Sequence, residues 1–349
     1  SEDFYMKKFI VFILSAIFFV GIFSGCSLSN DGGGVGEQGE TDGLKIVVTV
    51  FPEYDWLREI MGEVFFSSKV TFLLSNGVDM HSYQPSANDI IEISTCDIFV
   101  YVGGESDSWV EDALKNAENK DIKIINLIEI LGDAAKEEEI TEGMQAEEEL
   151  EEENGNSSHS LGEANGEGDT ASYDEHVWLS LKNSVIFCER ISEALQEVDP
   201  QNAGTYRENT ERYVEKLIEL DSEFSSSIDN SSKKTLLFGD RFPFRYLIDD
   251  YSLSYYAAFP GCSAESEASF ETISFLAARL NDLDITTVLT VDGSDGGIAE
   301  AIISASGKSD VQILSLDSMQ STTLADAQNG KSYLSIMKDN LDVLKIALS

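Results

Sequence analysis

The chain is organised around residues 77–85, GVDMHSYQP. This polar stretch follows an apolar run at residues 70–74 and precedes a helix start, so it is predicted to be a loop that leaves the end of a strand. The chain has only three histidines, and besides His81 in this loop they are His159 and His176. His81 and His176 both lie in polar, turn-rich segments. They are either metal ligands that the fold brings together or two ordinary loop residues.

Length and charge limit the class of protein. At 349 residues, a chain with 42% hydrophobic residues is expected to form two domains. The formal net charge is -41, and residues 137–153 alone contain ten glutamates. Such a surface repels nucleic acid and anionic membrane faces, so we expect no nucleic-acid partner. The charge suits a cationic ligand, although a solvated acidic surface accounts for most of it.

The first residues predict an export signal. Lys7 and Lys8 precede an apolar run at residues 9–23, and small residues stand directly before Cys26. This layout is that of a signal peptide over residues 1–26, and it is short for a membrane span. Small residues before a cysteine are similar to a bacterial lipoprotein cleavage box, which makes Cys26 the expected lipidation site. An uncleaved N-terminal anchor is the alternative, and both interpretations place the protein outside the cytoplasmic membrane and attached to it.

The remaining cysteines do not indicate a thiolate zinc cluster. Cys96 lies beside a predicted strand and Cys188 on an apolar helix face, so both are expected to be small buried residues. Cys262 lies in a loop, and no Cys-x-x-Cys pair is present.

Strands and helices alternate, which predicts an α/β fold of two lobes, each a small, mostly parallel sheet with flanking helices. The predicted strands are residues 44–51, 70–74, 98–102 and 122–126 in the first lobe, and 234–238, 255–259, 287–291 and 311–316 in the second. Between the lobes, a helical pattern of nearly thirty residues predicts one linking helix about 40 Å long. The expected organisation is a signal peptide (1–26), a flexible tether (27–43), an N-terminal lobe (44–198) with a disordered acidic insertion (133–173), the linking helix (199–231) and a C-terminal lobe (232–349).

Four acidic or histidine residues each lie in the segment just after a predicted strand. They are His81, Asp240, Asp292 and Asp317. Ligands of open α/β sheets bind beyond the carboxyl ends of the strands, so this shared position favours a binding site. Each Asp alone is equally typical of a helix cap.

The two histidine segments, residues 77–85 and 174–178 (DEHVW), resemble the ligand loops of a known family. That family is the metal-binding solute receptors of bacterial ABC importers, the zinc and manganese receptors sometimes called lipoprotein adhesins. Residues 316–318 (LDS) and 330–333 (GKSY) are similar to its C-terminal signature, in which the Asp is a ligand. The resemblance covers residues 44–349. Zinc-specific members also carry a mobile acidic or His-rich loop before the second histidine, where this chain has residues 133–173.

The third ligand departs from the family pattern. Family members place a His or a Glu after the first strand of the second lobe, whereas this chain has residues 239–241, GDR. Asp240 is the residue predicted for this position. Arg241 beside a cationic metal would be unfavourable unless it points away to pair with a carboxylate. The alternatives in the neighbouring loop are Cys262, Glu265 and Glu267.

The resemblance implies a receptor that captures a divalent cation between its lobes and delivers it to an ABC-transporter permease. The expected ligands are His81 and His176 from one lobe and Asp240 and Asp317 from the other. Nitrogen and carboxylate ligands suit zinc and manganese, and zinc is favoured as the transported metal. We expect a monomeric receptor without enzymatic activity, held at the extracytoplasmic face of the cell membrane by a lipid on Cys26, and we expect the linking helix to limit hinge motion.

Three other classes of protein are alternatives to a metal receptor. A secreted metallohydrolase could use the same histidines and carboxylates to activate water, although the sequence contains no His-Glu-x-x-His or Gly-x-Ser-x-Gly motif. A receptor for an organic solute would need an aromatic-lined cleft and an Arg that binds a carboxylate. In a pure adhesin the metal would be structural only.

Overall fold

The computed structural model describes residues 43–145, 173–263 and 267–349. The predicted signal peptide, its lipidation site Cys26, all of the tether but its last residue, His159 and Glu265 lie outside these residues. Within the described ranges, no helix is both long and apolar enough to cross a membrane.

The first lobe is built on a four-stranded parallel sheet in the order β2-β1-β3-β4. Its strands are β1 (Lys45–Val48), β2 (Lys69–Phe72), β3 (Ile98–Tyr101) and β4 (Lys123–Asn126). Successive β1 side chains enter different cores: Ile46 and Val48 join the largest apolar cluster, and Val47 joins a smaller cluster on the opposite face. Burial on both faces explains the continuous apolar run of this strand, since helices cover both sides of a parallel sheet.

Helices of the first lobe begin and end at the signals that the sequence carries. The α-helices are α2 (Phe51–Met61), α3 (Ala87–Thr95), α4 (Val110–Lys115) and α5 (Leu127–Leu131), and short 3-10 turns cover Gly62–Ser67 (η1) and Gly132–Ala134 (η3). Ser86 caps α3 as expected, because its side chain accepts a hydrogen bond from the Asp89 amide while the Asp89 carboxylate accepts one from the Ser86 amide. Gly62 ends α2 with φ of 55°, a conformation that favours glycine.

The second lobe repeats this topology with the parallel strand order β6-β5-β7-β8. Its strands are β5 (Thr235–Phe242), β6 (Ser254–Pro260), β7 (Thr287–Val291) and β8 (Gln312–Leu316), and its α-helices are α8 (Arg245–Asp250), α9 (Phe270–Asp282), α10 (Gly297–Ser306) and α11 (Leu324–Gln328). Here one sequence prediction is wrong. β5 was expected to end at residue 238, with Asp240 in the following loop, but it continues to Phe242 through a register irregularity between Phe238 and Arg241. The apolar run breaks at this bulge, which is why the pattern indicated a strand end.

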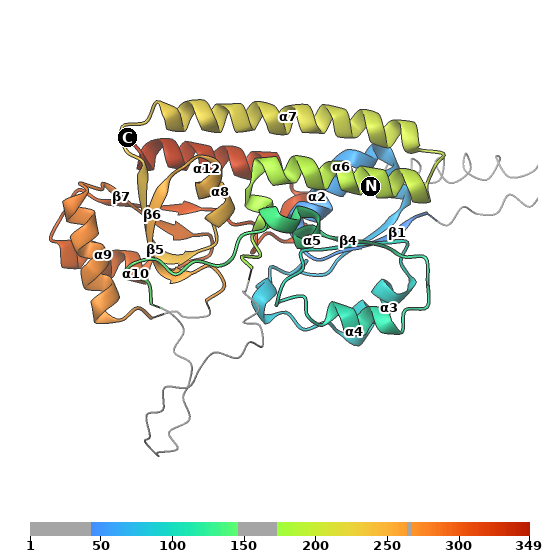
Figure 1. The fold of residues 1–349 in the computed structure, drawn as a ribbon, viewed down its shortest axis with the longest axis horizontal. Helices are drawn as coiled ribbons and strands as arrows, with labels where there is room; N and C mark the ends of the chain where they lie inside the picture. The colour runs from blue at the N-terminus through green and yellow to red at the C-terminus, as the bar shows by residue number, and fades with distance from the viewer. Residues whose placement is uncertain (1–42, 146–172, 264–266) are drawn as a thin grey trace, which may run out of the picture. The chain divides into compact units, whose positions relative to one another are not determined.

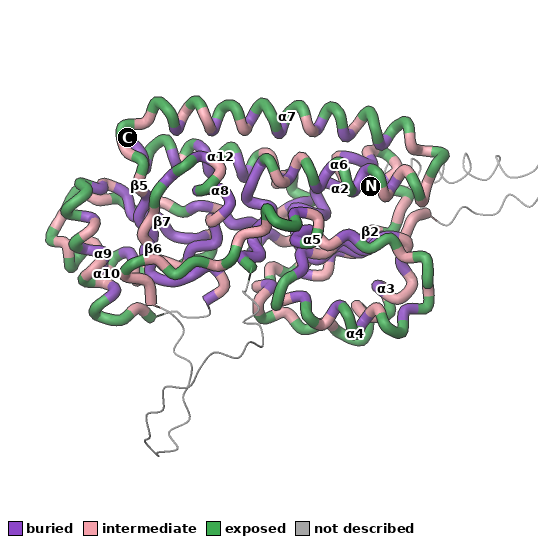
Figure 2. The backbone as a smooth tube through the Cα atoms, in the orientation of Figure 1, coloured by how far each residue is buried: buried purple, intermediate pink, exposed green. Residues whose placement is uncertain are grey.

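Three long helices run along one side of both lobes (Figure 1): α6 (Leu181–Val198), α7 (Ala203–Asp229) and α12 (Tyr333–Ala347). The 27 residues of α7 correspond to about 40 Å, as predicted for the linking helix. The helix α7 packs against α6, α2 and α12. Buried and exposed residues alternate along its length (Figure 2), and the buried ones are Tyr206, Thr210, Tyr213, Leu217, Leu220, Phe224 and Ile228.

The largest apolar cluster is continuous between the lobes. It joins Ile46 and Trp56 of the first lobe to Phe238 of the second and to Tyr333 of α12. At this junction the rings of Trp56 and Tyr333 lie edge to face with centroids 5.4 Å apart. The two lobes therefore share one dry core in addition to the linking helix. The predicted fold class, two parallel α/β lobes joined by one long helix, is confirmed.

Candidate metal centre

His81 lies in the loop that follows β2, within a short 3-10 turn, η2 (Met80–Ser82). Asp79 caps this turn, because its Oδ1 accepts a hydrogen bond from the His81 amide at 3.0 Å. The Nδ1 atom of the ring lies 2.9 Å from the Ser106 hydroxyl oxygen, which belongs to the segment after β3. The His81 side chain is 16% exposed, so the loop holds the ring at the edge of the protein interior.

His176 is fully buried directly before the turn η4 (Val177–Leu179). The carboxylate of Asp174 holds it twice: Oδ1 accepts from the His176 amide at 2.9 Å and lies 3.0 Å from Nδ1 of the ring. A carboxylate on one imidazole nitrogen fixes the tautomer that leaves the other nitrogen free to bind a metal. Asp174 therefore holds the His176 ring by Nδ1, with Nε2 turned towards His81 and Gln320.

The two histidines predicted as ligands face each other. Their Nε2 atoms are 3.4 Å apart, although the residues are 95 positions apart in sequence. Two nitrogens bound at about 2.0–2.1 Å to one tetrahedral zinc lie about 3.3–3.4 Å apart. The pair thus has the spacing of two ligands of a single ion.

Sequence reasoning missed a third polar group at this pair. The side-chain amide nitrogen of Gln320, in the turn after β8, lies 2.9 Å from Nε2 of His176 and 3.4 Å from Nε2 of His81. A half-turn of this amide would present its oxygen to the same point. Gln320 is three residues after Asp317. Its position beyond a strand end is the only sequence signal that could have indicated it as a site residue.

Asp240 lines the same cleft as His81, but main-chain groups hold its carboxylate. Oδ1 accepts from the Arg241 amide at 2.8 Å, and Oδ2 accepts from the Val291 amide of neighbouring β7 at 3.2 Å. These bonds stabilise the bulge in β5, so Asp240 has a structural role in the strand.

Asp317 follows β8 as predicted, but its carboxylate is occupied by other partners. Oδ1 accepts from the Met319 amide at 2.8 Å, and Oδ2 lies 2.7 Å from Nζ of Lys331. Burial and the nearby carboxylate of Asp292 raise the pKa of Asp317 despite the Lys331 ammonium. As the structure stands, the bonds that hold Asp240 and Asp317 are local and do not join them to the histidine pair.

The neighbouring loop places Cys262 beside His81, whereas Glu267 is exposed. One ring nitrogen of His81, one carboxylate oxygen of Glu175 and Sγ of Cys262 all lie within 4.8 Å of one another, the one such group of His, Cys, Asp or Glu ligands among the described residues. The pKa of Glu175 is lowered: burial opposes this, but the His81 ring and the Ser106 hydroxyl and amide favour the carboxylate.

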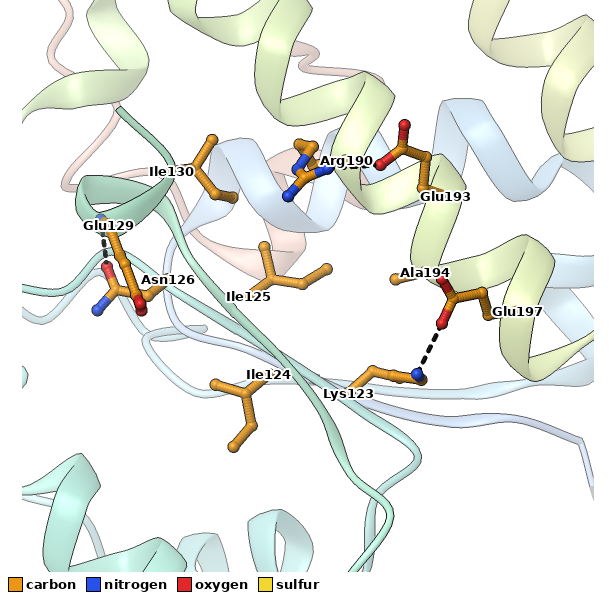
Figure 3. Close-up of a pocket in the computed structure, with 10 residues that line it drawn as sticks. All are labelled: Lys123, Ile124, Ile125, Asn126, Glu129, Ile130, Arg190, Glu193, Ala194 and Glu197. Atoms are coloured by element: carbon orange, nitrogen blue, oxygen red, sulfur yellow. Dashed lines mark hydrogen bonds and ion pairs between the residues drawn. The ribbon is translucent and has the colours of Figure 1, made fainter. Parts of the chain in front are cut away.

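The cleft that contains His81 and Cys262 has a volume of ≈ 610 Å³ and is lined from both lobes. Arg241 enters it from β5 and pairs with Asp79 of the first lobe, with Nη1 and Oδ2 2.6 Å apart. Arg241 is thus paired with a carboxylate, but it lies in the cleft and does not point away from it. A second hollow, between edge strand β4 and α6, contains none of the predicted ligands, and its charges pair locally, as in Lys123–Glu197 (Figure 3).

A two-lobed parallel α/β fold with an oriented histidine pair beside its cleft defines a metal-binding protein. The sequence profile of the family described as ZnuA, "Zinc-uptake complex component A periplasmic", matches residues 46–347. The chain therefore belongs to the ZnuA family.

Several relatives carry zinc in their names. The "Zinc-binding lipoprotein AdcA" of Streptococcus pneumoniae (strain ATCC BAA-255 / R6) is 29% identical over 310 residues, which are 88% of this chain and 56% of the relative. The "High-affinity zinc uptake system protein ZnuA" of Bacillus subtilis (strain 168) is 26% identical over 339 residues, 97% of each chain. The chain thus spans about half the length of the AdcA relatives and nearly all of the Bacillus protein.

Solved structures agree with the fold. The crystal structure of the Zn(II)-bound ZnuA-like domain of Streptococcus pneumoniae AdcA superposes with a TM-score of 0.65 at 25% identity, covering 87% of this chain and 98% of that one. The metal-dependent lipoprotein YcdH from Bacillus subtilis superposes with a TM-score of 0.68 at 22% identity over 87% of this chain and 99% of that one, a likeness of fold.

Proposed function

We propose that this chain is the extracytoplasmic receptor of a zinc importer. It captures a divalent cation between its two lobes and delivers it to an ABC-transporter permease. Membership of the ZnuA family and the zinc-binding names of the AdcA and ZnuA relatives support this function. Zinc is the favoured ion and manganese the second candidate.

The observation that carries the proposal is the distance of 3.4 Å between Nε2 of His81 and Nε2 of His176. It matches two ligands of one zinc ion, and Asp174 already orients one of the two rings. Without a metal, the Nε2 atoms of the two histidines would face each other directly. Between two neutral rings, at most one proton can lie between these nitrogens.

We propose that Asp240 and Asp317 are the carboxylate ligands from the second lobe, as the family resemblance implies. Metal binding would have to break bonds that the two carboxylates make in this structure. Asp240 would have to exchange the Val291 amide for the ion, and Asp317 would have to leave Lys331. Gln320, already beside both histidines, is the neutral ligand available before either rearrangement.

Delivery requires that the metal-loaded form differ from the empty form. A ligand shifts such an equilibrium only by its differential affinity for the two states. The apolar cluster and α7 tie the lobes together, so we propose a small change at the cleft, where side chains rearrange, and no large domain rotation. Solution scattering with and without zinc tests this: a large change in the profile would contradict it.

We further propose that the chain works as a monomer outside the cytoplasmic membrane, tethered to it by a lipid on Cys26. The name of the relative "Zinc-binding lipoprotein AdcA" supports this location. The domain organisation expected from the sequence, with a tether before residue 44 and a linking segment at residues 199–231, is part of the same proposal. The metallohydrolase alternative finds no support in the family, which is described as a zinc-uptake component.

Calorimetry on the metal-free chain tests the function. The full chain with Cys26→Ser is stripped with a chelator and titrated with zinc and with manganese. We expect one tight zinc equivalent, and loss of tight binding in both His81→Ala and His176→Ala. Unchanged zinc affinity in both variants would refute the site, and Glu197→Ala, which breaks only a surface ion pair, is the control.

A further inference from the structure

The two ring nitrogens of His81 face two different sets of ligand atoms. Nε2 faces His176 and Gln320. Nδ1 lies 2.9 Å from the Ser106 hydroxyl oxygen and 3.3 Å from Oε2 of Glu175. The groups on the Nδ1 side have no part in the function proposed above.

Glu175 is the first observation that points to a ligand on this side. Its side chain is only 2% exposed, yet a single oxygen, Oε1, is engaged, by the Ser106 amide at 2.8 Å. The other oxygen, Oε2, is buried and has no hydrogen bond of normal geometry, although the His81 ring beside it favours the charged carboxylate. A buried carboxylate oxygen without a donor is costly unless a cation or another donor reaches it. Its distance of 3.3 Å from Nδ1 of His81 is close to the about 3.4 Å between two such ligands of one zinc ion.

Cys262 is the second observation. Its Sγ lies within 4.8 Å of a ring nitrogen of His81 and of a carboxylate oxygen of Glu175, and the residue lines the cleft. In a tetrahedral zinc site, with sulfur at about 2.3 Å from the ion, the sulfur lies about 3.6 Å from the other ligand atoms. A shift of the sulfur by up to about 1.2 Å therefore completes a set of one nitrogen, one oxygen and one sulfur.

A neutral imidazole has one lone pair and one N–H group, so His81 can bind an ion through only one nitrogen at a time. Coordination through Nε2 leaves Nδ1–H to donate to the Ser106 hydroxyl. Coordination through Nδ1 needs the other tautomer. An ion on the Nδ1 side and an ion at the histidine pair therefore exclude each other.

We propose that His81, Glu175 and Cys262 form a second, outer metal position, which one ion occupies in alternation with the inner position at His81 and His176. The inference rests on the proposed metal-binding function and adds a thiolate to it. On binding, the Cys262 thiol gives its proton to solvent and the sulfur bonds to the ion. Thiolate ligands favour zinc and softer ions over manganese, so the outer position, which faces the cleft, selects against manganese.

Cobalt(II) is the probe for this position, because a thiolate bound to cobalt(II) gives an intense near-ultraviolet charge-transfer band that nitrogen and oxygen ligands do not. The full chain carries Cys26→Ser throughout. His176→Gln removes the inner position. We expect this variant to bind one cobalt ion, with lower affinity than the chain that keeps His176, and to show the charge-transfer band. The band should disappear when Cys262→Ser is added and persist with Cys96→Ala, the control for a buried thiol elsewhere.

Two results would overturn the outer position: no band in cobalt-saturated His176→Gln, or a band that Cys262→Ser leaves unchanged. Circular dichroism establishes that each variant is folded, and His176→Ala serves as a second variant for removing the inner position. These failures are distinct from failure of the proposed function, which would appear as unchanged zinc affinity in His81→Ala and His176→Ala.

Discussion

The guanidinium of Arg241, in a strand of the second lobe, is bonded to the carboxylate of Asp79, the residue that caps the His81 turn in the first lobe. The Nη1–Oδ2 distance is 2.6 Å, and both side chains are about one quarter to one third exposed. One carboxylate therefore both links the two lobes across the cleft and holds the loop of a proposed metal ligand. Burial alone would raise the pKa of Asp79, but Arg241 and the His81 amide outweigh it and lower the pKa, so the bond persists in mildly acidic solution.

Asp79→Ala should weaken zinc binding by about tenfold. The change removes a partly exposed ion pair and a hydrogen bond, each of which contributes about 1 kcal/mol, and it leaves the Arg241 cation unpaired beside the cleft. Competition with a chromophoric chelator measures the effect. Asp112→Ala, which breaks an exposed pair with Lys115, should leave zinc affinity unchanged. Adding Arg241→Ala to Asp79→Ala should recover part of the affinity; a further loss would contradict the repulsion argument.

Asp174→Ala should lower zinc affinity by about 10- to 100-fold, because His176 loses the acceptor that fixes its tautomer and orientation. The number of zinc ions bound should stay the same, since both histidines remain. Calorimetry gives both quantities. An affinity equal to that of the unmodified chain would show that packing alone orients the ring of His176.

Tyr333→Phe should destabilise the fold by about 1–2 kcal/mol without changing zinc stoichiometry. The buried hydroxyl of Tyr333 donates to the Trp178 carbonyl at 2.7 Å and lies 2.8 Å from the Ser184 hydroxyl. The variant removes this donor and leaves the carbonyl only the longer contact, at 3.3 Å, from the Ser184 hydroxyl. Urea unfolding measures the change. Tyr173→Phe, at a tyrosine that is 43% exposed, should stay within about 0.5 kcal/mol of the unmodified chain.

Glu53→Gln should flatten the dependence of stability on pH. Burial raises the pKa of Glu53 to about 8, although the Val50 and Thr49 amides, which donate to its carboxylate, oppose the rise. The folded chain therefore holds a proton that the unfolded chain releases near 4.5, and the stability from this group is lost as the pH rises from the unfolded value towards 8. Urea unfolding at about pH 5 and about pH 8 should show a smaller loss in Glu53→Gln than in the unmodified chain. An equal loss in both would mean that Glu53 is ionised throughout.

Sequence periodicity and caps were sufficient to predict most of the fold. The apolar run at residues 44–51 predicted a strand buried on both faces, and Ser86 predicted a helix start, because both depend on neighbours along the chain. The strand is shorter than predicted, since it covers Lys45–Val48 and Phe51 begins α2. The end of β5 could not be predicted in this way. Gly239 and Asp240 break the apolar pattern, but pairing with β6 and β7 carries the strand through them to Phe242.

For the candidate site, the sequence by itself determined which residue types are available: two histidines in polar loops, with acidic residues after several strands. Only the tertiary structure decided which atoms meet. It brings Nε2 of His81 to 3.4 Å from Nε2 of His176, adds Gln320, and places Glu175 and Cys262 on the other side of the His81 ring. Asp317 stands after a strand end as the pattern indicated, and Asp240 lies in the bulge of β5, where the pattern had indicated a loop. The oxygens of both are engaged, by neighbouring amides and by Lys331. The physical reason is that local sequence sets the position of a backbone segment, whereas the direction of a polar side chain depends on partners supplied by segments distant in sequence.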